Sequence, residues 1–364
     1  MRFERFLATS LLIILAAALL VTSLTHRYAG FRQQVFVDIP RGTTSRALAW
    51  KLAQQGVVRY PWQFLLVRRL RPAVSLKAGE YLFRKPASPW EVFDRLARGD
   101  VFYYHLTVPE GNNIFDIAAT LEARRIMPAE RFLEAARDPS LIRELDPKAP
   151  TLEGYLFPDT YRLTRRTSAS QLCRLMTDRF RWAWQRLGTP KVDLHSTVTL
   201  ASLVEKEARL NDDRPLIASV FLNRLRLRLP LQCDPTTIYA ALLEDRYRGA
   251  IYRSDLRSKQ IYNTYQHPGL PPGPIANPGL AALEAVLRPA QTHYLYFVLH
   301  PDGSGRHQFS KEMTAHERAV RKYRRGLNKT LQTKPAQRVP GPAAADPHNG
   351  NRVAAPAGPA GPHF

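Results

Sequence analysis

The chain begins with an uncharged apolar stretch, and behind it apolar residues recur at helical or strand spacing. Residues 6–24 (FLATSLLIILAAALLVTSL) carry no charged side chain, and their number is close to the roughly 20 apolar residues that cross a bilayer core. The alternative is a cleaved signal peptide, whose apolar region would be shorter, about 7–15 residues, with a clear cleavage site. We predict an uncleaved transmembrane anchor at 6–24, after a cytoplasmic stub at 1–5 and before a linker at 25–33.

The charges beside this segment do not fix its orientation, because arginines stand on both sides of it. A short N-terminal stub with a translocated body is the usual arrangement for a single N-terminal span. On that arrangement the protein is a single-pass protein of the plasma membrane, and its globular part lies outside the cytoplasm.

A strand–turn–helix pattern occurs twice, at Ile39–Val58 and at Val108–Met127. In each copy a short strand leads through Pro-x-Gly to a Thr or Asn cap and then to an amphipathic helix. At a constant offset the copies share four residues, which are Pro40, Gly42, Ala49 and Leu52 in the first and Pro109, Gly111, Ala118 and Leu121 in the second. Two such units suggest small modules resembling glycan-binding LysM modules, and a repeated scaffold without a ligand is an equal alternative.

The predicted fold class is α+β, with an N-terminal transmembrane helix, a LysM-like α/β module and a mixed α+β catalytic domain. Between the two copies, 79–83 is predicted as a strand, 88–100 as a capped helix ending near Gly99, and 102–108 as a strand. A first, LysM-like domain at 34–105 and a mixed α+β catalytic domain at 106–334 follow. Residues 335–364 are rich in Pro, Ala and Gly without periodicity, so we predict a disordered tail.

The net charge of the chain says less about its binding partners than the apolar segment at 6–24 does. The chain has 53 Lys+Arg against 31 Asp+Glu, a net charge of +22, which favours polyanions such as nucleic acid, anionic lipid or an acidic wall polymer. The basic residues are spread along the chain without an aromatic RNA-binding segment or a zinc-ligand array, so nucleic acid is disfavoured. The two cysteines, Cys173 and Cys233, have no metal-ligand spacing. A single disulfide and two buried thiols both remain open, and no metal or cofactor is predicted.

The segment Ser196–Leu225 contains the most informative helix. Its i, i+3, i+4 and i+7 positions are Leu200, Leu203, Val204 and Glu207. A carboxylate that continues an apolar face loses solvation, which raises its pKa toward the value a general acid needs. Glu205 lies about 200° around the helix from Glu207, so the two cannot form a dyad. On periodicity alone, a solvated charge run from Glu205 to Glu207 is the stronger interpretation.

Polar and aromatic candidates for substrate contact follow this helix. The next helix is predicted to be capped by Asp212 or Asp213, and Asn223 lies on its last turns. Gln232, Asp234 and Thr236 then stand in a turn before another helix. For Asp234, with a proline behind it, a capping role is favoured over catalysis.

A long loop, residues 261–279, lacks helical periodicity and is rich in proline and aromatic residues. Tyr262 and Tyr265 offer faces on which sugar rings can stack, and Asn263 and Thr264 offer hydrogen bonds to hydroxyl and acetamido groups. The prolines stiffen the loop, so less entropy is lost on binding. A rigid structural loop is the alternative to a wall of a substrate groove.

Six motifs in order resemble the endolytic murein transglycosylase family, also called the YceG-like family. They are ASLVEKEA (201–208), VFLNRL (220–225), LQCDPT (231–236), YNTY (262–265), GLPPGPIANPG (269–279) and YLYFV (294–298). The resemblance runs from the anchor to about residue 330 and implies that Glu207, the second glutamate of VEKE, is catalytic. It also implies a LysM-like subdomain and a periplasm-facing catalytic domain. Cys233 departs from the threonine expected there.

The implied reaction needs one carboxylate. Water-using glycosidases need two, about 5–5.5 Å or 6.5–9.5 Å apart, whereas a lytic transglycosylase uses the substrate's own C6 hydroxyl and leaves 1,6-anhydro ends. The resemblance implies peptidoglycan glycan strands as substrate, and an anchored cutter could work beside peptidoglycan synthases on nascent strands. Two alternatives stay open, which are a hydrolytic muramidase with Asp234 as second carboxylate and a non-catalytic wall-binding scaffold.

Overall fold

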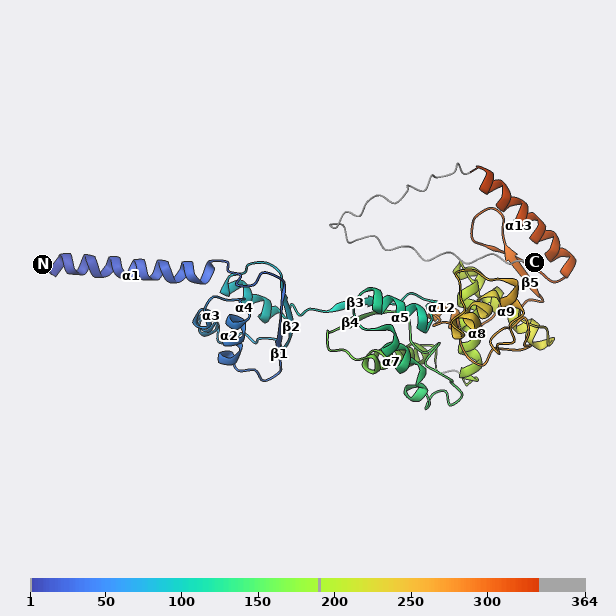
Figure 1. Ribbon diagram of the computed structural model, residues 1–364, viewed down its shortest axis with the longest axis horizontal. Coiled ribbons are helices and arrows are strands. Elements are labelled where there is room, and N and C mark those ends of the chain that lie inside the picture. The colour runs from blue at the N-terminus through green and yellow to red at the C-terminus, as the bar shows by residue number, and fades with distance from the viewer. Residues whose placement is uncertain (1, 189–190, 334–364) are drawn as a thin grey trace. The chain divides into compact units, whose positions relative to one another are not determined.

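The structure, a computed structural model, describes residues 2–188 and 191–333. Two compact units make up the chain, one of residues up to Tyr104 with Arg162–Arg166 and the other of the remainder. Within the described residues, the secondary structure consists of helices and three two-stranded sheets (Figure 1), in agreement with the predicted mixture of helix and sheet. The tail predicted at 335–364 lies outside the described residues.

The first unit begins with the apolar helix α1 (Arg2–Thr25), which contains a stretch, Arg5–Thr25, long and apolar enough to cross a membrane, with a mean hydropathy of 2.4. Behind it, β1 (Val35–Ile39) and β2 (Gly79–Phe83) pair antiparallel with Val37 opposite Tyr81. The helices α2 (Ser45–Gln54), α3 (Pro61–Leu70) and α4 (Pro89–Arg98) pack a core with them. Leu24, near the end of α1, also belongs to that core.

The predicted helix at 88–100 is confirmed by its two ends. Ser88 accepts a hydrogen bond from the backbone N–H of Glu91, whose side chain reaches back to Ser88, so two free N–H groups are satisfied. Gly99 ends the helix in the left-handed region at φ 79°, a conformation that costs a side-chain-bearing residue free energy. The strand predicted at 79–83 is β2.

The repeated strand–turn–helix pattern is confirmed as a local structure. In the first copy β1 leads through Gly42 (φ 82°) to α2, and Thr44 caps the helix by accepting from Ala47 N. In the second, β3 (Tyr104–Thr107) leads through Gly111 (φ 77°) to α5 (Ile114–Ala123), capped by Asn113. The likeness of these units to LysM modules stays a prediction.

The second unit is mainly helical. Its further elements are α6 (Ala129–Arg137), β4 (Thr160–Leu163, paired with β3), α7 (Ala169–Arg186), α8 (Leu194–Glu207), α9 (Arg214–Arg226), α10 (Asp234–Leu243), α11 (Arg253–Leu256), α12 (Leu280–Leu287), β5 (Tyr296–Leu299), β6 (His307–Ser310) and α13 (Met313–Thr333). Short 3-10 turns occupy Pro139–Leu141 and Asn211–Asp213. α8 is central, because it packs against α9, α10 and α12. The hairpin β5–β6 packs against α13 (Figure 1).

The predicted cap of α9 is wrong. Asp213 directly precedes α9 but has helical dihedral angles and makes no side-chain cap, because the 3-10 turn leads straight into the helix. Its Oδ2 instead accepts from the backbone N–H of His307 at 2.8 Å and lies 2.8 Å from His307 Nδ1. The carboxylate therefore fixes the hairpin strand β6 to the start of α9.

Candidate active site

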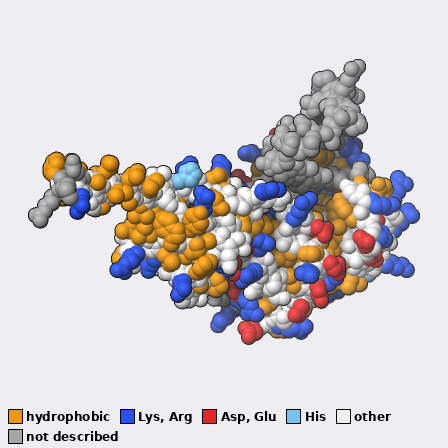
Figure 2. Space-filling model, turned by 60° about the vertical axis from the view of Figure 1, so that its left-hand side comes forward, with side chains coloured by type: hydrophobic (Ala, Val, Ile, Leu, Met, Phe, Trp, Pro, Cys, Tyr) orange, Lys and Arg blue, Asp and Glu red, His pale blue; other side chains and the backbone are white. Residues whose placement is uncertain are grey.

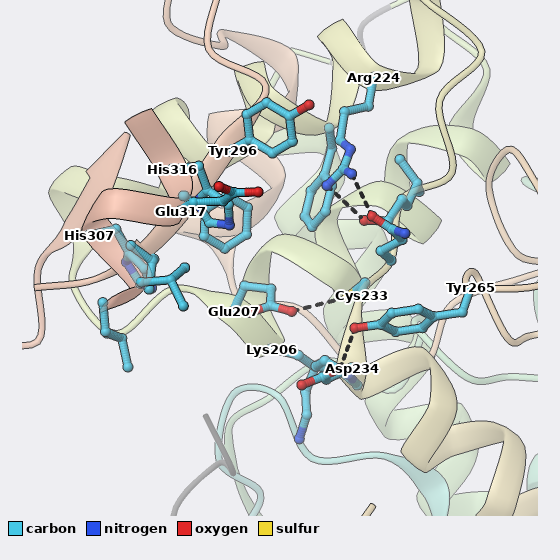
Figure 3. Close-up of a pocket in the computed structure, with 18 of the residues that line it drawn as sticks. Lys206, Glu207, Arg224, Cys233, Asp234, Tyr265, Tyr296, His307, His316 and Glu317 are labelled. Atoms are coloured by element: carbon cyan, nitrogen blue, oxygen red, sulfur yellow. Dashed lines mark hydrogen bonds between the residues drawn. The ribbon is translucent and has the colours of Figure 1, made fainter. Parts of the chain in front are cut away.

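A cavity of about 420 Å³ opens in the second unit where α8 ends (Figure 3). Its walls come from the ends of α8 and α9, the start of α10, the hairpin β5–β6 and one face of α13. The polar residues that line it are Lys206, Glu207, Arg209, Arg224, Gln232, Cys233, Asp234, Tyr265, Tyr296, His307, His316, Glu317, Arg321 and Arg324. Segments far apart in the sequence thus meet around one glutamate.

Glu207 is the last residue of α8, and its carboxylate lies in the cavity (Figure 3). The Cys233 thiol donates a hydrogen bond to Glu207 Oε1, with Sγ 3.2 Å away. The pKa of Glu207 is raised from 4.5 to about 7, mainly by loss of solvation. The negative charge of Asp234 also raises this pKa, whereas the thiol and Lys206 lower it. A carboxyl group with this pKa holds its proton about half the time at pH 7, which suits a general acid.

Glu205 points to the other side of α8, as the helical geometry predicts. Its side chain is buried, Arg214 Nη2 lies 2.7 Å from Oε1, and the backbone N–H of Gly279 donates to Oε2 at 2.9 Å. Both oxygens of Glu205 are therefore used inside the fold. The prediction of a solvated charge run is therefore wrong at Glu205, because this residue forms a buried ion pair with Arg214.

Three of the other candidates line the cavity together with Glu207, namely Gln232, Asp234 and Tyr265. The Tyr265 hydroxyl donates to Asp234 Oδ1 at 2.6 Å (Figure 3), so one Asp234 oxygen is committed to the loop. Asp234 is the first residue of α10 and Cys233 holds the cap position, with no side-chain cap bond. The capping role expected for Asp234 is thus replaced by contact with Tyr265. Gln232 Oε1 accepts from Arg224 at 2.8 Å.

The other five candidates are buried and do not line the cavity: Asn223, Thr236, Tyr262, Asn263 and Thr264. Asn223 Nδ2 donates to two carbonyl oxygens, of Thr292 at 3.0 Å and of Tyr294 at 2.9 Å, ahead of β5. Asn263 Nδ2 donates to the carbonyls of Asp255, Leu256 and Ser258. These amides satisfy backbone carbonyls at the end of α11 and ahead of β5, and their contact with a sugar stays a prediction.

Thr236, Thr264 and Tyr262 support the site from behind. The hydroxyl oxygens of Thr236 and Thr264 are 2.9 Å apart, and Thr264 Oγ1 accepts from the backbone N–H of Cys233 at 3.0 Å. The pair thereby places the thiol that reaches Glu207. The Tyr262 ring packs against the Tyr239 ring at 5.1 Å and is buried, so it offers no open face for stacking.

Sequence reasoning missed the wall opposite the long loop. The Arg224 guanidinium lies 5.5 Å from the centroid of the Tyr296 ring, which stacks on His316 of α13 at 5.1 Å and 20°. Loss of solvation lowers the pKa of both Arg224 and His316. Their motif context gave Arg224 and Tyr296 a signal, but nothing in the sequence of α13 points to the cavity.

Another carboxyl group with a raised pKa, Glu153, was also missed. Burial raises its pKa to about 8, and it accepts from Ile114 N and from Asn277 Nδ2, both at 2.9 Å. Asn277 Oδ1 in turn accepts from the backbone N–H groups of Gly154 and Leu156. Glu153 does not line the cavity, so this network supports the α5 turn and the long loop.

Both cysteines are buried and unpaired. Of the two possibilities left open by the sequence, a disulfide and two free thiols, the structure has the free thiols. Within the described ranges, no group of three or more His, Cys, Asp or Glu residues is arranged to hold a metal ion.

Fold and site together define an α+β protein whose second unit holds a cavity with a poorly solvated glutamate at a helix end. The chain belongs to the YceG-like family, whose sequence profile matches residues 37–322. It is 33% identical over 309 residues to the endolytic murein transglycosylase of Bacillus subtilis (strain 168), covering 79% of this chain and 84% of that protein.

Two further relatives agree. The endolytic murein transglycosylase of Streptococcus pneumoniae (strain ATCC BAA-255 / R6) is 29% identical, over 80% of this chain and 59% of that protein. A 2.6 Å crystal structure of a yceG-like protein from Listeria monocytogenes matches with a TM-score of 0.52 at 30% identity, covering 79% of this chain and 99% of that one.

Proposed function

We propose that the protein is an endolytic lytic transglycosylase that cuts peptidoglycan glycan strands, with Glu207 as its single acid and base. The observation that carries the proposal is the position of Glu207 at the end of α8, in the cavity, with a pKa raised to about 7. The names of the Bacillus and Streptococcus relatives support the substrate class and the enzyme class, a carbon–oxygen lyase.

In this mechanism the protonated Glu207 donates its proton to the oxygen between N-acetylmuramic acid and N-acetylglucosamine while the bond from that oxygen to the muramyl C1 breaks. The Glu207 carboxylate then takes the proton of the muramyl C6 hydroxyl, whose oxygen bonds to C1. The products are a 1,6-anhydro-muramyl end and a strand with a free N-acetylglucosamine 4-hydroxyl. No water is consumed, and Glu207 ends protonated, ready for another cycle.

We place the enzyme at the plasma membrane through α1, with the domain at 106–334 outside the cytoplasm. An apolar helix of this length supports a single-pass anchor. The domain at 34–105 would add strand binding if it acts as a LysM-like module. An anchored cutter near the site of polymerisation would act on nascent strands beside peptidoglycan synthases.

The decisive experiment digests purified glycan strands with the wild type and with Glu207→Gln and identifies the new ends by mass. Anhydro ends, each lighter by one water than a reducing end, are expected from the wild type and not from Glu207→Gln. Glu317→Gln is the matched control, because Glu317 also lines the cavity but is half exposed and paired with Arg321. It should cut as the wild type does.

Two other results would redirect the proposal. Reducing muramyl ends would indicate a hydrolytic muramidase, for which Asp234 is the second carboxylate within the same cavity. Against it, Asp234 Oδ1 already accepts from Tyr265. Strands that are bound but never cut by the wild type would indicate a non-catalytic scaffold.

A further inference from the structure

The helix α3 carries large apolar side chains on its exposed side as well as on the side that faces the core. Phe64 and Val67 face the core, whereas Trp62 is 45% and Leu70 is 58% exposed on the other side. Leu65 and Leu66, between them, are half-buried. Clustered apolar side chains on an exposed surface mark a site of contact with a protein or a membrane.

The exposed tryptophans Trp62 and Trp90 are sequence neighbours of the two residues that bind the C-terminal end of α1 and the chain just after it. Gln63 Nε2 donates to Ser23, to the carbonyl at 3.0 Å and to the hydroxyl at 2.8 Å, and Trp62 is its neighbour in α3. Glu91 of α4 forms an ion pair with Arg27, and its neighbour Trp90 is 36% exposed. Figure 2 shows hydrophobic side chains on the body next to the apolar helix. The exposed apolar surface of α3 and α4 therefore adjoins the end of the predicted membrane span.

Basic residues predominate around this patch, where the acidic residues Glu91 and Asp94 are paired with Arg27 and Arg71. The sequence from Pro40 to Ala78 contains no acidic residue, while lysines and arginines recur through it. Arg59 and Arg69 are exposed at either end of α3, and the Arg59 guanidinium lies 5.5 Å from the Tyr60 ring. Anionic headgroups attract such basic segments, and Trp and Tyr concentrate at the membrane–water interface.

We propose that the surface of Tyr60, Trp62, Leu70 and Trp90 docks into the headgroup region of the anionic bilayer that α1 crosses. The first unit then rests on the membrane through aromatic and leucine side chains, with arginines at the phosphates. This inference rests on the anchor in the proposed function and is independent of the reaction. A protein partner covering the same patch is the competing occupant, and pure lipid vesicles distinguish the two.

The test uses the full chain reconstituted in vesicles of phosphatidylcholine with phosphatidylglycerol, carrying one environment-sensitive fluorophore at a new cysteine. Native Cys173 and Cys233 are buried, so the folded protein is labelled at the new site. Trp62→Cys tests the patch, Leu15→Cys tests the span, and Trp182→Cys is the matched control, a tryptophan 41% exposed in the second unit. Thermal unfolding of each variant verifies its fold.

If the surface docks, the fluorophore at position 62 should emit at shorter wavelength, and lipids brominated near the headgroup should quench its emission. The fluorophore at position 182 should show neither effect. Adding Leu70→Asp should reduce the quenching at position 62. If position 15 is quenched while position 62 behaves like position 182, docking is overturned and the anchor stands. If position 15 stays in water, the anchor itself fails. Omission of phosphatidylglycerol should weaken quenching at position 62 and leave position 15 unchanged.

Discussion

Replacing Glu207 by glutamine should make the protein more stable at alkaline pH while removing its activity. The pKa of Glu207 is about 7 in the folded chain against 4.5 when solvated. Between these values the unfolded chain has lost the proton and the folded chain still holds it, so wild-type stability falls as pH rises through this window. At about 1.4 kcal/mol for each tenfold change in proton affinity, the loss reaches about 3 kcal/mol by pH 8.

Glutamine has the shape of the protonated acid and no proton to lose. Glu207→Gln should therefore match the wild type at pH 4 and exceed its free energy of unfolding by about 3 kcal/mol at pH 8. Urea denaturation of both detergent-solubilised proteins at several pH values measures the difference, and contributions common to both cancel. A difference that does not change with pH, or a variant less stable at pH 8, would show that the carboxylate is not desolvated as described.

Four further predictions concern Glu205, the pH profile of the wild type, Cys233 and Asn263. Glu205→Gln removes the nearer carboxylate of the buried Arg214, at 2.7 Å, and leaves only Glu110 at 3.8 Å. It should therefore lower the free energy of unfolding by about 3 kcal/mol, seen as an earlier urea midpoint at pH 8. The kcat/KM of the wild type should be level below pH 7 and fall about tenfold per pH unit above it; a bell with a second limb would indicate another essential group. Cys233→Ala removes the donor that lowers the pKa of Glu207 and should move that fall to higher pH, whereas Cys233→Ser should move it back. Asn263→Ala removes the hydrogen bonds to the carbonyls of Asp255, Leu256 and Ser258 and should cost about 2–3 kcal/mol in thermal or urea unfolding.

Local structure was predictable wherever a short pattern has one physical solution. Ser88 with Glu91, followed by Gly99, specifies both ends of α4, because the cap bonds and the left-handed residue act within a few positions. The same holds for the two strand–turn–helix units. At Asp213 local chemistry was ambiguous, since a carboxylate before a helix can cap it or bind elsewhere. A contact with β6 settled it, and no local pattern contains that contact.

The sequence could not predict which polar candidates line the cavity and which are buried behind it, again for a physical reason. A loop without ladder partners needs side chains to satisfy its own carbonyls, and Asn263 and Thr264 are as suited to that as to a sugar. Only the fold decides, and it buries them. His316 could not be predicted because α13 packs on the hairpin β5–β6, and only the folded chain brings its face to the cavity that holds Glu207.

Glu205 and Glu207 show how one helix end gives two identical side chains different chemistry. Glu205 has Arg214 at 2.7 Å and a backbone N–H at 2.9 Å, two donors that stabilise its charge. Glu207 has a thiol at 3.2 Å, a weak donor, and Asp234 nearby, which opposes its charge. The first is therefore held in the fold by an ion pair and a backbone hydrogen bond, whereas the second can give up a proton and take it back near neutral pH. Where a pair of carboxylates is separated in this way, the proton-transfer role falls to the one with the raised pKa.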